Sequence, residues 1–539
     1  MESINSSVQT NSDSGQDQHS RSFWISSIDP LMFDPLQQDM ISDVVVVGAG
    51  IAGLTIAYKL ASEGKDVVVL ERDLIGSGET GHTTAHITHA LDDRYAELEK
   101  MFGEEKTRLA AQSHTAAIDF IDQVVRKENI QCDFMRVDGY LFLHPSDEIS
   151  TLEEELKATR RAGLLTEMTE NIPGIDTQEG PALRFQNQAQ FHPLKYLHGL
   201  CQAILKYGGK IYTGTMVKEF NQHSVKTEHF TVKANHIIVA TNTPVNDLVT
   251  MHTKQFPYRS YVIGASIPKG VLKPALWWDT GELDSPWPTD PYHYVRLQPF
   301  SDTEDLLIIG GEDHKTGQPG KENIEESQRF DYLEAWAKIK FPQITRIIHR
   351  WSGQVMEPVD SLAFIGRNPG DENIYIVTGD SGNGMTHCTI AGMLIPDLIM
   401  GRSNPWEKLY SPSRLPVRAF GQYITEAANM AAQYADYLMA GDIESVNELS
   451  SNEGAVMKAS GKRVAVYKDE HGALYAYSAV CPHLGCSVRW NSFEKTFDCP
   501  CHGSRFTTAG KVINGPANSD LKPIEIKYEE ITSRHYEKH

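Results

Sequence analysis

Four of the seven cysteines in this 539-residue chain lie between Cys481 and His502, and two histidines lie in the same segment. Cys481 and His483 form a C-x-H motif, and Cys499 and His502 form a C-x-x-H motif fifteen residues later. Two thiolates and two imidazoles can hold a tetrahedral zinc ion. They can also hold a [2Fe–2S] cluster, with the cysteines on one iron and the histidines on the other. The segment therefore predicts a metal centre of one of these two kinds.

The residues around these ligands favour the cluster over zinc. The boxes CPHLGC and CPCHGS place two further cysteines, Cys486 and Cys501, at matching positions. Each box also holds a glycine, which lets the backbone approach inorganic sulfide, and a proline-containing turn follows at Gly515 to Ala517. The region from about residue 452 to 530 resembles the Rieske domain of respiratory cytochrome bc complexes.

The resemblance implies four iron ligands and one disulfide that clamps the two loops: Cys481 and Cys499 on the inner iron, His483 and His502 on the outer iron, and Cys486 joined to Cys501. A disulfide is unusual in a cytoplasmic protein. Loops that already hold the two sulfurs close together favour the pairing, and a buried bond resists reduction.

One residue after the second box departs from the respiratory pattern. High-potential Rieske domains carry a serine and a tyrosine there, and both donate hydrogen bonds to cluster sulfurs. Ser504 is present here, but Phe506 stands where the tyrosine would be. With one donor fewer, the reduced cluster is less stabilised, so we expect a reduction potential below that of the respiratory proteins.

A second motif, GAGIAG, lies near the start of the chain and contains Gly48, Gly50 and Gly53. It follows a run of valines, opens a helical segment, and precedes a second apolar strand that ends at Glu71. This βαβ context is what a dinucleotide site requires, since the glycines allow a tight turn and the helix N-terminus attracts a pyrophosphate. Glu71 is predicted to accept hydrogen bonds from the ribose hydroxyls.

A later glycine-rich segment indicates FAD rather than NAD. No second G-x-G-x-x-G is present, but IYIVTGDSGNGMT, residues 374–386, predicts a strand, a glycine loop and a helix N-terminus. Residues 42–405 resemble the D-amino-acid oxidase (DAO) superfamily, in which such a helix faces the flavin pyrimidine. The resemblance implies further flavin contacts beside the four residues named above: Arg72, Thr80, His82, Thr83, Gly379, Gly382, Gly384, Met385 and Thr386.

Two finer predictions concern the flavin and its substrate. His82 stands where the dimethylglycine dehydrogenase group has a histidine bonded covalently to the flavin 8α-methyl, and simple packing beside the ring is the alternative. The strand YHYVRL resembles the substrate-domain strand that carries a carboxylate-binding arginine in amino-acid oxidases. Arg296 would be that anchor, with Tyr294 nearby, because a guanidinium fork suits a carboxylate. Tyr261, in the strand YRSYVI, is a further candidate if that strand crosses the flavin face, and a core or edge position is its alternative. A surface ion pair is the alternative for the arginine.

These motifs predict an α/β Rossmann-type, DAO-like FAD-binding domain interleaved with an α+β substrate domain, followed by a small all-β Rieske domain. We expect a disordered N-terminal tail over residues 1–40, the oxidoreductase domain over 41–412, a helical linker over 413–451 and the Rieske domain over 452–539. The three single cysteines, Cys132, Cys201 and Cys388, are expected to be buried apolar residues.

Composition narrows the possible partners and the location. The formal net charge of −21 argues against nucleic acid. No apolar run is long enough to span a bilayer, and the polar start MESINSSVQT does not read as a secretory signal. We therefore expect a cytoplasmic protein that is not integral to a membrane.

Together the two halves predict a dehydrogenase that oxidises a small amine or amino acid at FAD and passes electrons singly through the cluster to a protein or quinone. The whole chain resembles a bacterial family of FAD-dependent oxidoreductases with a C-terminal Rieske domain. One alternative is an electron-transfer module that a partner reduces, without an amine substrate of its own. Another is a Rieske oxygenase with a mononuclear iron, which His86, His89 and Asp92 could imitate in spacing.

Overall fold

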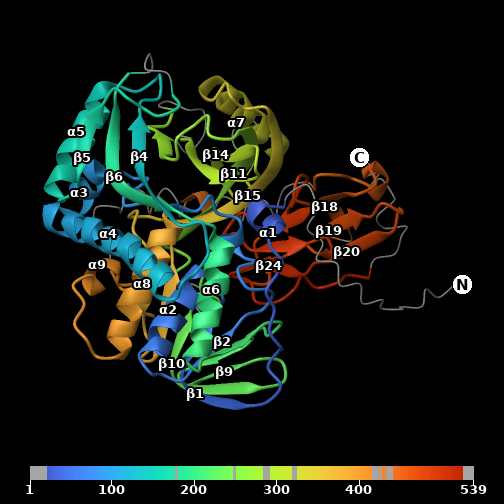
Figure 1. Cartoon of the computed structure of the whole chain (residues 1–539). Coiled ribbons are helices and arrows are strands. Elements are labelled where there is room, and N and C mark those ends of the chain that lie inside the picture. Colours follow the sequence, from blue (N-terminus) through green and yellow to red (C-terminus); the bar gives the residue numbers. More distant parts are fainter. Residues whose placement is uncertain are drawn as a thin grey trace, which may run out of the picture.

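The computed structural model describes most of the chain in three parts, which Figure 1 shows as a lower sheet, an upper sheet and a β domain at their side. The described residues are 21–175, 180–246, 251–282, 292–318, 324–414, 424, 428–430, 433, 441–459 and 461–525. Among them, no helix combines the length and the apolar character needed to cross a membrane.

The lower sheet has eight strands and carries the predicted βαβ unit. Its path runs β16-β17-β10-β1-β2-β7, and the hairpin β8-β9 extends from β10. The strands are β1 (Met40–Val47), β2 (Val67–Leu70), β7 (Lys210–Tyr212), β8 (Glu219–Asn221), β9 (Ser224–Lys226), β10 (Thr231–Val239), β16 (Phe364–Arg367) and β17 (Ile374–Thr378). Strands β17, β10, β1, β2 and β7 are parallel. Their valines and isoleucines are buried, apart from Ile41 near the start of β1, as expected for a parallel sheet covered on both faces.

Three helices cover one face of this sheet and pack on each other: α2 (Ile51–Ser62), α6 (Pro193–Lys206) and α8 (Gly384–Ile399). Helix α2 connects β1 to β2, and α8 follows β17 directly. Both helices therefore begin at the carboxyl edge of the parallel strands, which is where open α/β sheets bind their ligands.

The upper sheet has nine strands, which come from chain segments inserted between those of the lower sheet. Its path runs β15-β11-β14-β13-β12-β4-β6-β3, and β5 pairs with β6. The strands are β3 (His86–Ile87), β4 (Met135–Phe142), β5 (Thr166–Thr169), β6 (Ala182–Gln190), β11 (Gln255–Pro268), β12 (Leu276–Asp279), β13 (Tyr294–Pro299), β14 (Glu304–Lys315) and β15 (Arg346–Pro358). This is the predicted interleaved substrate domain.

Helices lie around the upper sheet. Helix α7 (Glu326–Lys340) packs on β11 and β14. Helix α5 (Ile149–Arg161) packs on β5 and β6, and α3 (Tyr95–Phe102) packs on α5. Two helices contact the lower half instead: α4 (Glu104–Lys127) packs on α8, and the short α9 (Glu407–Tyr410) packs on β16. Figure 1 shows α3, α4 and α5 on the side away from the β domain.

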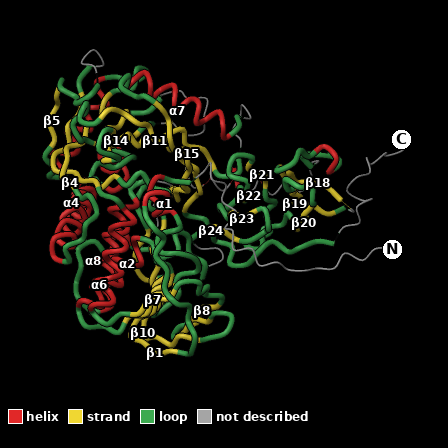
Figure 2. The backbone as a smooth tube through the Cα atoms, turned by 45° about the vertical axis from the view of Figure 1, so that its right-hand side comes forward, coloured by secondary structure: helices red, strands yellow, loops and turns green. Residues whose placement is uncertain are grey.

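The C-terminal domain consists of two small antiparallel sheets, visible at one side in Figure 2. One sheet contains β18 (Glu453–Ala459), β19 (Lys462–Lys468) and β20 (Leu474–Ser478). The other contains β21 (Arg489–Asn491), β22 (Thr496–Asp498), β23 (Arg505–Thr507) and β24 (Val512–Asn514). Described residues before the predicted boundary at 452 also belong here, because Ile443 forms a bridge with Met457.

The predicted tail over residues 1–40 is wrong for its second half. Residues Phe23–Ser27 form helix α1, capped by the hydroxyl of Ser22. Trp24 is fully buried, and its indole Nε1 donates to the Thr83 carbonyl at 2.6 Å. Residues 1–20 and most of the predicted linker helix over 413–451 lie outside the described residues.

Candidate functional site

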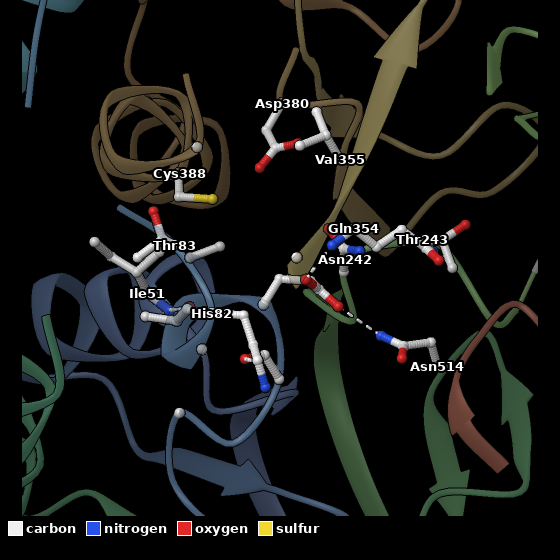
Figure 3. Close-up of a pocket in the computed structure, with 18 of the residues that line it drawn as sticks. Ile51, His82, Thr83, Asn242, Thr243, Gln354, Val355, Asp380, Cys388 and Asn514 are labelled. Atoms are coloured by element: carbon white, nitrogen blue, oxygen red, sulfur yellow. Dashed lines mark hydrogen bonds between the residues drawn. The ribbon is translucent and has the colours of Figure 1, made fainter. Parts of the chain in front are cut away.

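A cavity of about 2600 Å³ opens where the two large sheets meet the C-terminal domain. Figure 3 shows Ile51, His82 and Thr83 on one side of it and Thr243 and Asn514 on the other. The volume exceeds what one drug-sized ligand needs, so a cofactor and a substrate can share it.

The GAGIAG turn forms one end of the cavity. Gly48 has φ +105°, and a Cβ there would clash with the Ala240 carbonyl oxygen, so only glycine fits. Gly48 and Gly50 line the cavity, whereas Gly53 does not. A Cβ at Gly53 would instead clash with the Gly48 carbonyl, so this glycine lets α2 pack closely against the turn.

Glu71 lies at the end of β2 and lines the same part of the cavity. Its carboxylate accepts the backbone N–H of Ala49 at 2.7 Å and that of Asp73 at 2.9 Å. Burial is the main cause of the raised pKa of Glu71, and the two N–H groups act in the opposite direction. Each carboxylate oxygen can accept a further hydrogen bond, so Glu71 is placed to receive ribose hydroxyls.

The second glycine loop lies opposite, between β17 and α8. Gly379, Gly382, Gly384 and Met385 line the cavity as predicted. Thr386 does not: it is buried, and its hydroxyl bonds to His114 Nδ1 at 2.8 Å and donates to the Asn383 carbonyl at 3.2 Å. These contacts do not support the predicted flavin contact of Thr386.

Four further predicted flavin residues line the cavity: Arg72, Thr80, His82 and Thr83. The Thr80 hydroxyl accepts the N–H of Ile51 at 3.1 Å in the first turn of α2. His82 Nδ1 lies 3.0 Å from the Gly78 carbonyl, which orients the imidazole. Sequence alone could not fix this ring orientation.

The upper sheet supplies a second wall of the cavity. Tyr294 lines the cavity, and its hydroxyl bonds to Ser260. Nearby, Tyr292 donates to Asp92 Oδ2 at 2.6 Å. Ser260 also bonds to Asp313, and burial raises the pKa of Asp92 and Asp313 to about 7 each. No sequence motif marks these two carboxylates, so their position at the cavity could not be predicted from the sequence.

Two predicted substrate residues lie outside the cavity. Arg296 is fully buried, and its guanidinium donates to the Ala85 and Phe191 carbonyls at 2.9 and 2.8 Å. Trp24 of α1 covers it, with 5.2 Å between the guanidinium carbon and the ring centroid. The predicted carboxylate anchor is therefore wrong. Tyr261 is also wrong as a substrate neighbour, because it packs against Phe330 on the α7 side of the sheet.

The four predicted iron ligands converge in the C-terminal domain. The thiols of Cys481 and Cys499 are hydrogen-bonded to each other, and both are buried. The rings of His483 and His502 lie edge to face with centroids 4.8 Å apart. The remaining two cysteines of the boxes, Cys486 and Cys501, form the implied disulfide, with an S–S distance of 2.04 Å.

The loops that carry these ligands lie directly behind the cavity wall. A Cβ at Gly503, the neighbour of His502, would lie 2.8 Å from Nε2 of Gln354, and Gln354 lines the cavity. On the same side His252, from the segment before β11, packs on the rings of His483 and His502 with centroid distances of 4.7 and 5.8 Å. Only one layer of side chains therefore separates the cavity from the ligand loops.

Polar contacts hold the C-terminal domain in this position. Arg259 of β11 and Arg505 of β23 both donate to Glu494, each at 2.6 Å. Asn514 donates to Glu79 at 2.7 Å, the bond drawn as a dashed line from Asn514 in Figure 3. Arg259, Arg505 and Glu494 are nearly inaccessible to solvent, so this ion-pair network is a buried one.

The mononuclear iron site of an oxygenase does not form. His86 bonds to Thr84 and the Val295 carbonyl, His89 bonds to Gln188, and Asp92 bonds to Tyr292. Among the described residues these three side chains do not converge as metal ligands. The structure therefore contradicts this alternative.

Both implied cofactors fit the residues present. Oε1 of Gln354 is buried at the cavity and has no hydrogen-bond partner among the described residues, so a ligand donor would satisfy it. In the C-terminal domain, Nδ1 of buried His502 likewise has no hydrogen-bond partner in the described chain, as expected of a nitrogen reserved for iron. The donor set of two thiols and two imidazoles matches a Rieske cluster.

Comparisons with known proteins agree with these sites. Residues 43–398 match the FAD dependent oxidoreductase (DAO) family, and residues 441–525 match the Rieske [2Fe-2S] domain. The Rieske 2Fe-2S iron-sulfur protein YhfW of Bacillus subtilis is 33% identical over 94% of this chain and 97% of its own length. Gamma-glutamylputrescine oxidoreductase of Escherichia coli is 27% identical over 71% of this chain and 90% of its own length.

Solved structures share the fold of the larger part. Glycine oxidase from Geobacillus kaustophilus has a TM-score of 0.57 and 17% identity, and it covers 70% of this chain and 99% of its own. L-proline dehydrogenase from P. horikoshii has a TM-score of 0.56 and 21% identity, and it covers 70% of this chain and 98% of its own. With two thirds of its length in the family match and a whole-length relative, the chain belongs to the DAO family of FAD-dependent oxidoreductases and carries a C-terminal Rieske [2Fe–2S] domain.

Proposed function

We propose that the protein oxidises a small amine or amino acid at FAD and passes the electrons one at a time through its Rieske cluster to an external protein or quinone. The observation that carries this proposal is the position of the ligand loops at the cavity wall, where Gly503 contacts Gln354. Bound FAD supplies a two-electron acceptor for hydride, and the cluster supplies a one-electron carrier.

The chain's own residues supply the positioning for such a transfer. The glycine turns hold the cofactor ends, and Tyr294 with Ser260 faces the remaining space. The Arg259–Glu494–Arg505 network fixes the cluster domain against the cavity. A cluster held this close serves electron transfer, whereas an oxidase that uses oxygen directly has no need of it.

The relatives support the class of substrate without fixing its identity. The name of gamma-glutamylputrescine oxidoreductase refers to an amine compound, and its alignment covers 71% of this chain. The test is anaerobic mixing of the purified holoenzyme with a panel of amines and amino acids, with flavin and cluster absorbance followed together. Reduction of both centres by one compound is expected. Reduction only by NAD(P)H or a partner protein would establish the electron-transfer module instead.

The proposal includes a covalent bond between His82 and the flavin, since the ring nitrogen Nε2 is left open by the contact of Nδ1 with Gly78. Acid precipitation of the holoenzyme should leave flavin fluorescence on the unfolded chain. The His82→Ala variant should release it. A colourless wild-type pellet would show that the contact is non-covalent.

A further inference from the structure

Five carboxylates gather at the substrate-facing part of the cavity, which we call the acidic chamber: Asp92, Asp93, Asp313, Glu357 and Asp380. They come from the segment after β3, from β14, from β15 and from the loop before α8. Figure 3 shows the side chain of Asp380 beside Val355, above the labelled residues of the flavin end. The chamber is therefore part of the cofactor cavity and not a separate surface cluster.

The carboxylates lie next to the second flavin loop. A Cβ at Gly382 would clash with Asp92 Oδ2, so the absence of a side chain at Gly382 lets this carboxylate approach the loop. Asp92 is oriented by the Tyr292 hydroxyl at 2.6 Å. Because the loop also lines the cofactor part of the cavity, a group bound by Asp92 would lie close to the flavin.

Neutral hydroxyl groups provide several of the hydrogen bonds to these carboxylates. The Ser381 hydroxyl oxygen lies 3.0 Å from a carboxyl oxygen of Asp93 and 2.8 Å from one of Glu357, and its single proton can be donated to one of them at a time. Ser260 bonds to Asp313. Burial is the largest cause of the raised pKa of Asp92, about 7, and of Asp380, about 6; repulsion by Asp93, Asp313 and Asp380 adds to it for Asp92, and repulsion by Glu79 adds to it for Asp380. The pKa values of Asp93 and Glu357 are raised for the same reasons.

The arginines that line the cavity in the described part of the chain are largely engaged elsewhere. Arg259 and Arg505 bond to Glu494, and Arg72 donates to the Ile513 carbonyl at the other end of the cavity. Arg94 donates to the Thr280 carbonyl, and its charge also acts on Asp93, where it opposes the larger effect of burial on the pKa. The charges of Arg329 and His293 act in the same direction on Asp313. Arg296, the predicted carboxylate anchor, lies outside the cavity.

Aromatic side chains line the same space. Trp278, Tyr292 and Tyr294 face the cavity from β12, the segment before β13 and β13, and Tyr258 faces it from β11. The rings of Tyr292 and Tyr294 lie 5.4 Å apart. An organic ammonium binds favourably to carboxylates and to aromatic faces, whereas a carboxylate is repelled by both.

We propose that the acidic chamber selects a cationic amine that lacks a free carboxylate, and that a diamine fits it best. This inference rests on the proposed function, because it assigns the substrate class of the same flavin site. A diamine carries a second ammonium, and the chamber offers carboxylates from several elements to accept both ends. Amino acids, with their carboxylate, are the class that the chamber excludes.

The test compares three ligands with the same four-carbon chain. Putrescine, butylamine and 4-aminobutanoate are titrated anaerobically into the holoenzyme at pH 8, and binding is read from the shift of the flavin spectrum. Putrescine should bind most tightly and 4-aminobutanoate most weakly, with about tenfold between successive ligands. Equal affinities, tighter binding of 4-aminobutanoate, or no binding of putrescine would overturn the proposal.

Matched variants locate the effect. Asp92→Asn and Asp313→Asn should each weaken putrescine binding about tenfold and leave 4-aminobutanoate unchanged or tighter. Asp302→Asn removes an exposed carboxylate from the turn between β13 and β14 and should change neither ligand. Wild-type putrescine affinity in both Asp92→Asn and Asp313→Asn would contradict the proposal. If one of the two variants does not fold, the other still provides the test.

The same samples separate this inference from the proposed function, since flavin reduction is recorded beside binding. Putrescine that binds without reducing the flavin, in a protein that no amine or amino acid reduces, contradicts the dehydrogenase and leaves the chamber's selectivity standing. Reduction by amino acids, with no binding of amines, contradicts the selectivity and leaves the dehydrogenase standing.

Discussion

Two walls of the same cavity use buried carboxylates in opposite ways. At the wall shared with the Rieske domain, Glu494 accepts charge-assisted hydrogen bonds from Arg259 and Arg505. In the acidic chamber, Asp92 and Glu357 accept hydrogen bonds from the hydroxyls of Tyr292 and Ser381. A neutralised carboxylate fastens two domains together, whereas one bonded to a hydroxyl keeps its charge available to a ligand.

The largest effect should come from removing an iron ligand, which tests whether the two walls are independent. Cys499→Ser should abolish the cluster's absorbance and its EPR signal, because one of four ligands is lost. Electron delivery to the external acceptor should stop, while putrescine affinity should change by less than about twofold. Cys201→Ser, which alters another buried cysteine, should keep the cluster. Loss of putrescine binding in Cys499→Ser alone would show that the walls are coupled.

The second-largest effect is expected at the neutralised wall, the wall shared with the Rieske domain where Glu494 pairs with Arg259 and Arg505. Burial raises the pKa of Glu494, but the guanidinium groups of Arg259 and Arg505 outweigh it and hold that pKa below its usual value. Glu494→Gln leaves buried guanidinium charge without its counterion and should lower the free energy of unfolding by about 3–5 kcal/mol. Denaturant unfolding measures this loss, and transfer from flavin to cluster should slow in stopped-flow experiments.

An exposed ion pair is the control for that variant. Glu219→Gln breaks a pair with Lys226 in which both side chains are about half exposed, so it should change stability by less than about 1 kcal/mol. If Glu494→Gln is as stable as Glu219→Gln and transfers electrons at the wild-type rate, the network does not hold the domains in place.

The cofactor motifs could be found in the sequence because each is local. The iron ligands lie in two short boxes, and Gly48 and Gly50 lie in one turn, so spacing and the neighbouring residues identify them. The chamber has no such signature. Asp92, Asp313 and Glu357 lie far apart in the chain, and only the pairing of the upper sheet brings them to one cavity.

The wrong prediction for Arg296 also arose from contacts between segments that are far apart in the chain. Arg296 lies two residues after Tyr294 on β13, so both side chains are on the same face of the strand. Helix α1 places Trp24 over the guanidinium, and the segment at Ala85 supplies carbonyl acceptors. Because residues 1–40 were expected to be disordered, the sequence offered no reason to expect a cover over Arg296.

Acidification should weaken the chamber's binding without affecting the neutralised wall. The raised pKa of Asp92, about 7, reflects burial first and then repulsion by Asp93, Asp313 and Asp380, with the Tyr292 hydroxyl acting in the opposite direction. Since these carboxyls gain protons as pH falls through about 7, the dissociation constant of putrescine should rise about tenfold between pH 8 and pH 6.

Calorimetric titration in buffers of matched ionic strength measures this dependence. Asp92→Asn removes one of the titrating groups and should flatten the profile. The free energy of unfolding of the ligand-free protein should change in the opposite direction and rise as the pH falls. A carboxyl with a raised pKa destabilises the fold only when it is ionised, and acidification removes that charge. A putrescine affinity that stays constant from pH 8 to pH 6 would contradict the role of the chamber carboxylates.

The smallest effect is expected inside the Rieske domain, on the reduction potential of the cluster. Ser504 is fully buried and hydrogen-bonded to Cys481, whereas Phe506, also buried, has no hydroxyl to donate. Phe506→Tyr adds a donor that favours the more negative, reduced cluster, so its potential should rise by about 60 mV, the one-electron equivalent of a hydrogen bond of about 1.4 kcal/mol. Protein-film voltammetry measures the shift, and Phe506→Leu, which adds no donor, should not raise the potential.

Putrescine affinity should be the same in both variants, because residue 506 lies inside the Rieske domain and every chamber carboxylate stays in place. A wild-type potential already equal to that of respiratory Rieske proteins would show that the missing hydroxyl does not set the value.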